Sequence, residues 1–559
     1  MTTEPDVDVA TGLDMLLVDG ALGPLRRLLP AVPALRVAAS LAVRPVAVTR
    51  RAMGLAAELA RIGSGRSEVA PYPKDKRYTD PAWSENPVLR RLVQAHIAAS
   101  GTASGLVADA ELDWADRERV RFAVGNISDA LAPSNSLLNP VAWRAAVDTR
   151  GASVVRGVRH LVSDLATQPR VPMMVEPDAF EVGEDVAATP GAVVFRTAVF
   201  ELIQYLPQTA SVRAIPLLLV PPTINKYYVA DLAPGRSIVE NLVRGGQQVF
   251  LMSWRNPGAE HAAWDLDTYG QAVLDAMAVC ERITRTRSTS LMAFCSGGMI
   301  TSMVLGHLAA AGAQDRVASV TFAVTVLDQH RAGTMGAMLD AVTARNAVDA
   351  SARKGYLDGR MLAEVFAWLR PNDLIWSYWV NNYLGGRSPK AFDILFWNAD
   401  TTRMTAGLHR DFIDIALRNA LVTPGAATML GTPVDLSKVD RDTYVVAGVA
   451  DHLCAWQSCY RTTQLLGGAS RFVLSTSGHI ASLINPPGNP KASFRVADPP
   501  PADPEAWLDG AATERGSWWP DHVAWLARRS GPELDAPPEL GGRGMHALVP
   551  APGEYVMAR

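Results

Sequence analysis

The sequence predicts an α/β fold, in which a mostly parallel sheet carries helices on both faces and a mainly helical region precedes it. Three observations predict this class. Short β-rich runs alternate with helical segments after about residue 190. Before about residue 180 the apolar spacing is helical throughout. The 559 residues are too many for one ordinary domain, so either two domains or one large enzyme core with an attached region is expected.

Composition narrows the class of protein. Hydrophobic residues at 48% and charged residues at 19% are typical of a folded globular chain. A net charge of −3 gives no basic face that could displace counterions from nucleic acid, so no nucleic-acid partner is predicted. Four cysteines are too few for a disulfide framework, which indicates a reducing compartment such as the cytoplasm.

The N-terminal part is predicted to be helical in two sections. Residues 1–70 form a variable segment whose residues 20–62 have amphipathic spacing, ending at the turn-rich "GSGRSEVAPYPKD". Residues 71–185 form a second α-rich domain. The acidic start lacks a signal-peptide pattern, and Arg36 and Arg44 interrupt the apolar stretch 28–48, so no transmembrane segment is predicted.

Residues 186–559 are predicted to form the catalytic α/β domain. Its strands are expected in "AVVFRTAVFELIQY", "IPLLLVPP", "QQVFLMSW", "TSLMAF", "VASVTFAVTVLD", "DTYVVAGVAD" and "RFVLSTSGH". In the helix "LDTYGQAVLDAMAVCERI" the residues Tyr269, Val273, Met277 and Cys280 share one face, which predicts core packing for Cys280.

An insertion at about 329–440 interrupts the alternation and is rich in aromatic residues. Insertions of this kind often lie over the carboxyl edge of the sheet, so a cap over the active site is predicted. The insertion contains Trp376, Tyr378, Trp379 and Trp397, which could exclude water from an active site below the cap. A packing subdomain or a dimer interface is the alternative reading.

Cys295 stands in "TSLMAFCSGGMI", between a predicted strand ending at Phe294 and a helix ending at Gly312. A core thiol, a metal ligand, a disulfide partner and a nucleophile are all open for a cysteine in this position. Strand, tight turn and helix are the context of a nucleophile elbow, with Ala293 and Gly297 at its two small positions. The helix N-terminus predicts a lowered pKa for the Cys295 thiol.

Partners for such a nucleophile follow in the chain order of an α/β-hydrolase: nucleophile, acid, histidine. Asp451 follows one strand and His479 follows the next, so the three side chains could meet at one sheet edge. Asp328 competes for the role of the acid; we favour Asp451, because its turn directly precedes the strand of the histidine, and expect Asp328 to anchor the insertion. His452 is a weaker choice for the base than His479.

The remaining cysteines carry no motif. Cys454 and Cys459 are five residues apart, a spacing that matches no common metal site, and we expect both to be structural. The ten histidines form no HExxH or similar cluster. The sequence therefore predicts neither a metal nor a cofactor.

Several long motifs resemble the polyhydroxyalkanoate synthases of the single-polypeptide type. They are "VPPTINKYYVADLAPGRSIVENLVRGGQQVFLMSWRNP", "AFCSGG", "LRPNDLIWSYWVNNYLGG", "FDILFWNAD", "VADHLCAW", "SGHIASLINPPGNPK" and "GSWWPDHVAWL". "DKRYTDPAWSENPVLRRLVQA" and the closing "PAPGEYVMAR" resemble the N-terminal domain and tail of that family. The likeness covers about residues 70–559. Ala293 replaces the first glycine of the family box G-x-C-x-G-G, a change that a small position should tolerate.

The resemblance implies an acyltransferase with Cys295, Asp451 and His479 as its catalytic residues. It implies a 3-hydroxyacyl-CoA substrate, a growing polyester chain as product, release of CoA, a homodimer, and a cytoplasmic location on polyester granules. For the tetrahedral oxyanion we expect the backbone N–H groups of Ser296 and Thr223 as donors. The amphipathic N-terminal stretch could rest on a granule surface or be an ordinary packed helix.

Two rivals remain. The first is a cysteine-dependent thioester or ester hydrolase, which would have the same fold and the same order of triad residues. The second is a granule-surface protein without catalytic activity.

Overall fold

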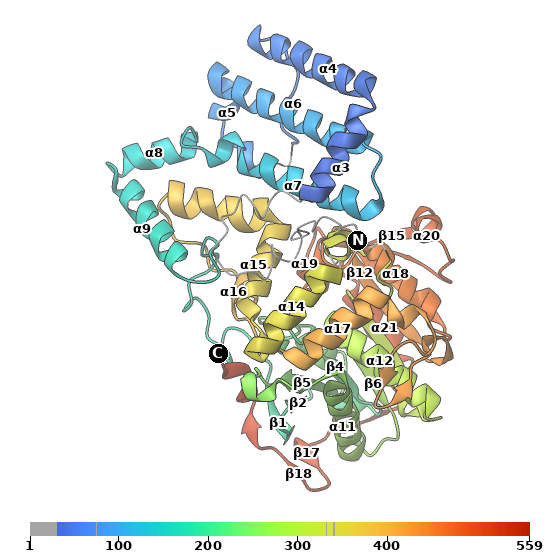
Figure 1. The fold of residues 1–559 in the computed structure, drawn as a ribbon. Helices are drawn as coiled ribbons and strands as arrows, with labels where there is room; N and C mark the ends of the chain where they lie inside the picture. Colours follow the sequence, from blue (N-terminus) through green and yellow to red (C-terminus); the bar gives the residue numbers. More distant parts are fainter. Residues whose placement is uncertain (1–30, 74, 331, 339–340) are drawn as a thin grey trace. The chain divides into compact units, whose positions relative to one another are not determined.

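A computed structural model describes residues 31–73, 75–330, 332–338 and 341–559 (Figure 1). The chain divides into two compact units. The helical unit contains Met1–Glu176, Thr334–Ala347 and Arg360–Lys390, and the sheet unit contains Pro177–Gly333, Val348–Gly359 and Ala391–Arg559. The start of the first predicted helix, residues 20–30, lies outside the described residues.

The helical unit confirms the prediction of a mainly α N-terminal region. The helices of its N-terminal part are α3 (Ala31–Ala42), α4 (Pro45–Gly63), α5 (Ala82–Glu85), α6 (Pro87–Asp109), α7 (Trp114–Ala130), α8 (Pro140–Asp148) and α9 (Ala152–Ala166). Asn86, Asp113 and Asn139 begin α6, α7 and α8 as N-caps, each accepting a backbone N–H with its side chain. Among the described helices none is long and apolar enough to span a bilayer alone; α3 and α4 together pass in length and composition, but they are bent by 96°.

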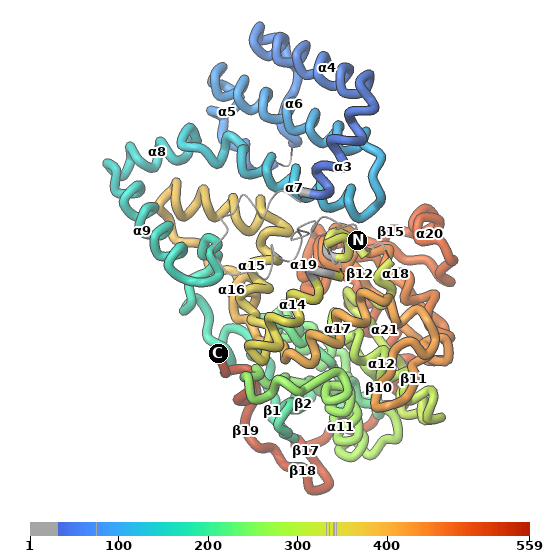
Figure 2. Tube along the Cα trace, viewed as in Figure 1, coloured from blue at the N-terminus to red at the C-terminus, as the bar shows by residue number. Residues whose placement is uncertain are grey.

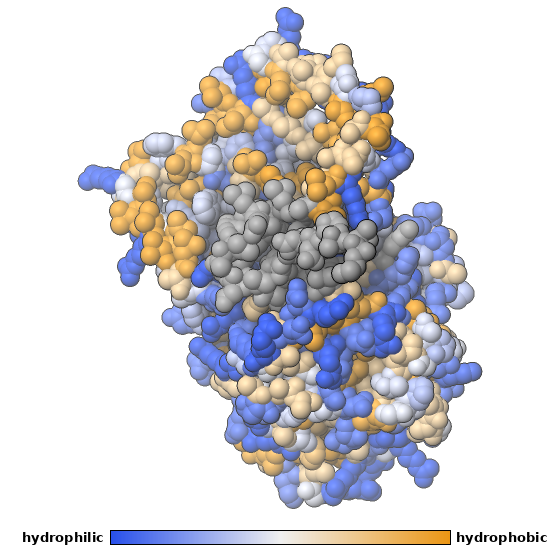
Figure 3. Space-filling model, in the orientation of Figure 1, coloured by the Kyte–Doolittle hydropathy of each residue, from blue (hydrophilic) through white to orange (hydrophobic). Residues whose placement is uncertain are grey.

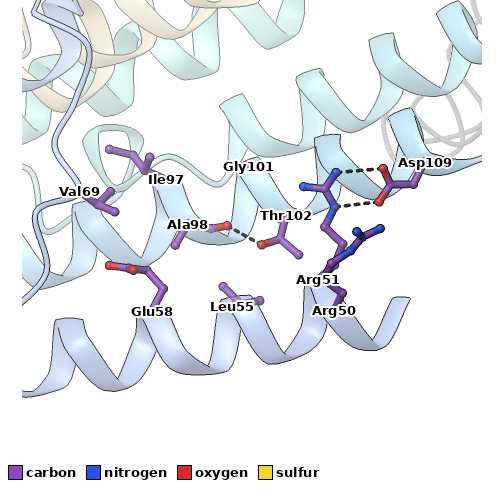
Figure 4. Close-up of a pocket in the computed structure, with 11 residues that line it drawn as sticks. Arg50, Arg51, Leu55, Glu58, Val69, Ile97, Ala98, Gly101, Thr102 and Asp109 are labelled. Atoms are coloured by element: carbon purple, nitrogen blue, oxygen red, sulfur yellow. Dashed lines mark hydrogen bonds and ion pairs between the residues drawn. The ribbon is translucent and has the colours of Figure 1, made fainter. Parts of the chain in front are cut away.

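A surface hollow of about 760 Å³ lies along α4 and α6 (Figure 4). Arg51 on α4 and Asp109 on α6 form a two-point ion pair at its edge, with Nε···Oδ2 of 2.8 Å. The carboxylate of Asp109 and the guanidinium of Arg51 are thus hydrogen-bonded to each other. The residues that line the hollow include no nucleophile paired with a base. We therefore assign no catalytic role to this hollow.

Helices α8 and α9 carry exposed apolar side chains. On α9 they repeat at helical spacing: Val154, Val155, Val158, Val162 and Leu165 are all at least half exposed. Trp143 and Val147 add to them from α8. Apolar residues gather over these two helices in the space-filling view (Figure 3). We call these seven residues the α8–α9 apolar surface; patches of this kind mark interaction sites.

The sheet unit is built on one eleven-stranded sheet with the order β15-β14-β13-β12-β7-β6-β4-β5-β2-β1-β19. The six central strands are parallel: β5 (Val249–Trp254), β4 (Leu217–Val220), β6 (Thr289–Phe294), β7 (Val317–Ala323), β12 (Thr443–Gly448) and β13 (Ser470–Ser475). Their side chains are almost entirely buried, which explains the continuous apolar runs in the sequence.

Antiparallel strands extend both edges. They are β2 (Phe200–Tyr205), β1 (Gly191–Arg196) and β19 (Val549–Pro550) on one edge, and β14 (Ser493–Ala497) and β15 (Ala512–Arg515) on the other. The strand β19, near the C-terminus, pairs with β1 (Figure 2). The chain end also fixes the loop after β4, because the buried Lys226 donates from Nζ to the carbonyl of Ala558 at 2.8 Å and pairs with Asp400 at 3.1 Å.

Helices cover the sheet at the positions that the alternation predicted. They are α10 (Ile238–Arg244), α11 (Leu266–Thr284), α12 (Ser296–Ala310), α18 (Trp456–Leu465), α19 (His479–Leu483), α20 (Pro504–Gly510) and α21 (Trp519–Ala527). On α11 the face formed by Tyr269, Val273, Met277 and Cys280 is buried, which confirms core packing for Cys280.

The chain between β7 and β12 adds no strand to the main sheet over its described residues, 324–330, 332–338 and 341–442. It contains α13 (Gly333–Met338), α14 (Ala341–Lys354), α15 (Gly359–Leu369), α16 (Asp393–Ala399) and α17 (Ala406–Arg418). Trp376 and Trp379 contact each other within the helical unit. Trp397 belongs to the sheet unit, where its Nε1 donates to the carbonyl of Lys226 at 2.7 Å. The role of this insertion as a cap stays a prediction.

Candidate active site

Cys295 occupies the turn between β6 and α12, at the N-cap of the helix. Its φ of 49° and ψ of −117° lie outside the regions that a side chain normally adopts. The backbone N–H of Cys295 donates to the carbonyl of Ala323 at 3.0 Å, which ties the turn to β7. A residue held in such a conformation by its neighbours is presented at the edge of the sheet, as a nucleophile elbow requires.

The two glycines after the cysteine allow this turn to close. A Cβ on Gly297 would lie 2.5 Å from the carbonyl oxygen of Pro221, and one on Gly298 would lie 2.1 Å from Oγ1 of Thr325. Both distances are far below van der Waals contact, so a Cβ at either position would force its neighbours to shift. Ala293, in the remaining small position, is fully buried without a clash that would require glycine.

His479 begins α19, in the loop after β13, and its Nδ1 lies 2.7 Å from Oδ2 of Asp451. The other oxygen of Asp451 accepts the backbone N–H groups of Leu453 at 2.8 Å and Cys454 at 2.9 Å. With Nδ1 engaged by the carboxylate, Nε2 is the ring nitrogen left to act as a base.

The helix that begins with His479 is fixed from outside. Trp518 and Trp519 donate their indole N–H groups to the carbonyls of Ser482 at 2.8 Å and Leu483 at 2.9 Å. All four residues are buried. These two bonds satisfy carbonyls at the end of a helix of only five residues, and so they hold the imidazole in place.

The structure brings the thiols of Cys295 and Cys454 and a ring nitrogen of His479 within 4.8 Å of one another. Three separate elements meet here: the N-cap of α12, the loop after β12, and the first residue of α19. Cys295 is partly exposed, and the other two are buried.

Electrostatics set the proton affinities of this group. Burial lowers the pKa of His479, but the charge of Asp451, its hydrogen bond and the neighbouring Cys295 together outweigh burial and raise that pKa to about 10. The neighbouring Cys454 thiol and burial together raise the pKa of Cys295 well above its usual value. The predicted lowering of the pKa of Cys295 is therefore wrong. At Cys295 the neighbouring thiol and burial outweigh the helix N-terminus.

Ser296 and Thr223, the predicted oxyanion donors, lie together. The backbone N–H of Thr223 donates to Oγ of Ser296 at 3.0 Å, and the two hydroxyl oxygens are 3.2 Å apart. The hydroxyl oxygen of Ser296 thus already accepts the hydrogen bond from the backbone N–H of Thr223. Ser296 itself is the first residue of α12, where backbone N–H groups have no partner within the helix.

Asp328 is held elsewhere in the sheet unit. One oxygen lies 2.7 Å from Nε of Arg461, and the other accepts from Nδ2 of Asn419 at 2.8 Å. Asn419 ends α17 and belongs to the insertion. Asp451 is the one of the two carboxylates that bonds His479.

Sequence reasoning missed the position of Cys454. We expected a structural thiol, but its sulfur adjoins both Cys295 and His479. Its position three residues after Asp451, in a loop at the same sheet edge, was the available signal. Cys459 and Cys280 are fully buried. Two thiols and an imidazole are donors that soft metal ions prefer, so these three residues could also hold a cation.

Comparison with known proteins adds two family matches. Residues 74–242 match the family described as "Poly-beta-hydroxybutyrate polymerase (PhaC) N-terminus". Residues 216–486 match the family described as "alpha/beta hydrolase fold". The second match, together with the parallel sheet and the elbow, confirms the predicted fold.

Three curated proteins are similar over most of this chain. "Poly(3-hydroxyalkanoate) polymerase 2" of Ectopseudomonas oleovorans is 46% identical over 516 residues, 92% of each chain. "Poly(3-hydroxyalkanoate) polymerase 1" of the same organism is 43% identical over 90% of each chain. "Poly(3-hydroxyalkanoate) polymerase subunit PhaC" of Cupriavidus necator is 41% identical over 89% of this chain and 85% of that protein.

Proposed function

The chain belongs to the poly(3-hydroxyalkanoate) polymerase family, and we propose that it joins 3-hydroxyacyl groups from CoA thioesters into a polyester through a thioester on Cys295. One observation carries this proposal: the strained Cys295 adjoins a buried His479 that is itself bonded to Asp451. A nucleophile, a base and a group that orients the base are the parts that acyl transfer requires.

In the first step His479 takes the thiol proton, and the sulfur of Cys295 attacks the carbonyl carbon of the CoA thioester. The oxyanion formed accepts from the backbone N–H groups of Ser296 and Thr223, displacing the serine hydroxyl from the latter. The carbonyl re-forms, the bond to the CoA sulfur breaks, and the proton on His479 leaves with CoA. One thioester has replaced another, so the acyl group stays activated.

In the second step the 3-hydroxyl of one acyl unit attacks the thioester carbonyl of another, and His479 removes the hydroxyl proton. An oxoester bond forms, the carbon–sulfur bond of the attacked thioester breaks, the freed sulfur takes up the proton from His479, and the chain is one unit longer. Asp451 acts through His479, since its Oδ2 faces Nδ1 and its Oδ1 is engaged by two backbone N–H groups.

A raised pKa suits the resting thiol to this chemistry. Because the Cys454 thiol and burial raise the pKa of Cys295, its sulfur becomes a nucleophile when His479 removes its proton during attack. Asp451 makes that transfer possible by strengthening the base.

We also propose that the α8–α9 apolar surface contacts the polyester granule. A water-insoluble aliphatic polyester offers a surface that exposed valines can cover, and five of these apolar residues follow one stretch of α9. A second copy of this chain is the other occupant that this surface could take.

The direct test uses purified protein with 3-hydroxyacyl-CoA of four and of ten acyl carbons. Thiol release is followed together with precipitated polyester and free 3-hydroxy acid. The proposal expects CoA release matched by ester bonds in the precipitate. Accumulation of free 3-hydroxy acid without polymer would identify a hydrolase instead.

A further inference from the structure

Cys454 gives the active site a third donor atom that acyl transfer does not use. Its sulfur, the sulfur of Cys295 and a ring nitrogen of His479 all lie within 4.8 Å of one another. In a tetrahedral zinc site the bond lengths are about 2.3 Å to sulfur and about 2.0–2.1 Å to nitrogen, which places such ligands roughly 3.6–3.8 Å apart. Small rotations of the side chains would bring the three donors to that spacing.

The surroundings of His479 match those of a metal-binding histidine. Metal-bound histidines usually donate the second ring N–H to a carboxylate or a carbonyl, which fixes the free nitrogen toward the ion. Here Nδ1 is 2.7 Å from Oδ2 of Asp451. The same carboxylate accepts the backbone N–H of Cys454 at 2.9 Å, so Asp451 positions two of the three donors.

Access and donor type also favour a metal ion. Cys295 is partly exposed, so an ion can reach the group from solvent, and the two buried donors provide a dry site. Thiolates and imidazole select soft or borderline ions such as Zn²⁺ and Cd²⁺ over Mg²⁺ and Ca²⁺, which prefer oxygen. Three protein ligands leave a fourth position for water.

We propose that Cys295, Cys454 and His479 form a binding site for a thiophilic divalent cation of the zinc class, and that the bound ion blocks the nucleophile. Binding exchanges protons for metal: each thiol loses one proton and forms one metal–sulfur bond, with no change of oxidation state. With sulfur and imidazole both coordinated, Cys295 cannot attack and His479 cannot accept a proton. Binding depends only on the site geometry, whereas the block of activity rests on the proposed function.

The binding test uses the full chain, reduced and free of air, titrated with Cd²⁺ and with Zn²⁺. Cadmium–thiolate absorption should rise to a plateau at one ion per chain and should fall when Zn²⁺ is added, while Mg²⁺ has no effect. Titration in weak buffer should release at least two protons per ion, one from each thiol.

Two substitutions make the comparison specific. Cys454→Ala should weaken Cd²⁺ binding at least tenfold and remove one of the released protons. Cys280→Ala deletes a fully buried thiol on α11 and should bind Cd²⁺ like the parent chain. Equal affinity of Cys454→Ala and the parent chain overturns the site, and so does an equal loss in both variants. The stoichiometry and proton count in the parent chain test the site even if Cys454→Ala does not fold.

The activity test measures CoA release at increasing Zn²⁺, each variant relative to its own untreated rate. Half-inhibition of Cys454→Ala should require at least tenfold more Zn²⁺ than that of the parent chain or of Cys280→Ala. Cation binding by a chain that releases no CoA would leave the site standing and reject the proposed function. CoA release with no thiolate absorption at any Cd²⁺ concentration would do the reverse.

Discussion

Nδ1 of His479 and Oδ2 of Asp451 are 2.7 Å apart, although 28 residues separate them in the sequence. The contact fixes which ring nitrogen faces Cys295, and the charge of Asp451 raises the pKa of His479. Burial alone would lower that pKa; the charge of Asp451 is the largest contribution that raises it, and the neighbouring Cys295 adds to the rise.

Replacing Asp451 by Asn should therefore change both the rate and its pH dependence. The amide keeps the shape but cannot stabilise imidazolium by charge, so we expect kcat to fall by about 10²–10⁴. The pKa of His479 should fall, since a negative partner raises it. We expect the acid limb of kcat/KM above the usual histidine value of about 6.5 in the parent chain, and it should move to lower pH in Asp451→Asn. A pH profile of CoA release checks this, and an unmoved acid limb would contradict it.

Asp328→Asn is the matched control, because it removes the other carboxylate that follows a strand before His479. Its partners are Arg461 and Asn419, so the change should destabilise the fold by about 1–3 kcal/mol. The acid limb should stay in place. Chemical denaturation and the same pH profile measure the two effects. Loss of activity in Asp328→Asn with full activity in Asp451→Asn would exchange the two roles.

The glycines of the elbow differ in what they touch. Gly298→Ala places a methyl group against the side chain of Thr325, so Thr325→Ala in the same chain should restore part of the lost stability. Gly297→Ala meets backbone oxygens of Val220 and Pro221, which no side-chain substitution can relieve.

Each glycine substitution alone should cost about 1–3 kcal/mol and most of the activity. Gly510→Ala is the control, since its Cβ would meet nothing within 4 Å. The free energies of unfolding from denaturant titration measure the effects. Equal recovery of both elbow variants by Thr325→Ala would refute this account of the turn.

How much of the fold and of the candidate site could be predicted from the sequence depends on the kind of contact. The central strands were predictable because fully buried parallel strands are continuous apolar runs, as in "LLLV" of β4. Strands of two residues such as β19 carry no such pattern. The meeting of Cys295, Asp451 and His479 was also predictable, because each follows a parallel strand and such strands end at the same edge of the sheet.

The sequence could not predict contacts made by packing between distant segments. Cys454 meets Cys295 because two loops converge, and no spacing rule relates residues 159 positions apart. The direction of the pKa shift of Cys295 was wrong for the same reason, since the helix N-terminus is visible in the sequence and the burying neighbours are not. The support of α19 by Trp518 and Trp519 likewise appears only in three dimensions.

Granule attachment can be tested on the α8–α9 apolar surface. Val158→Asp with Val162→Asp puts two charges on the apolar side of α9, and we expect binding to isolated polyester granules to fall at least tenfold. Ser163→Asp adds a charge at an exposed polar position of the same helix and should bind normally. Co-sedimentation with granules measures this. Unchanged sedimentation, or a change in oligomeric state alone, would assign the surface to another role.

The central claim is that the acyl chain is carried on the sulfur of Cys295. The most direct measurement supplies butyryl-CoA, which lacks the 3-hydroxyl needed for extension, and maps the acylated peptide by mass spectrometry while CoA release is followed. We predict one butyryl group on the peptide containing Cys295, one CoA released per acylated chain, and neither in Cys295→Ala. An acyl group found on Cys454 instead, or CoA release that persists in Cys295→Ala, would contradict the account.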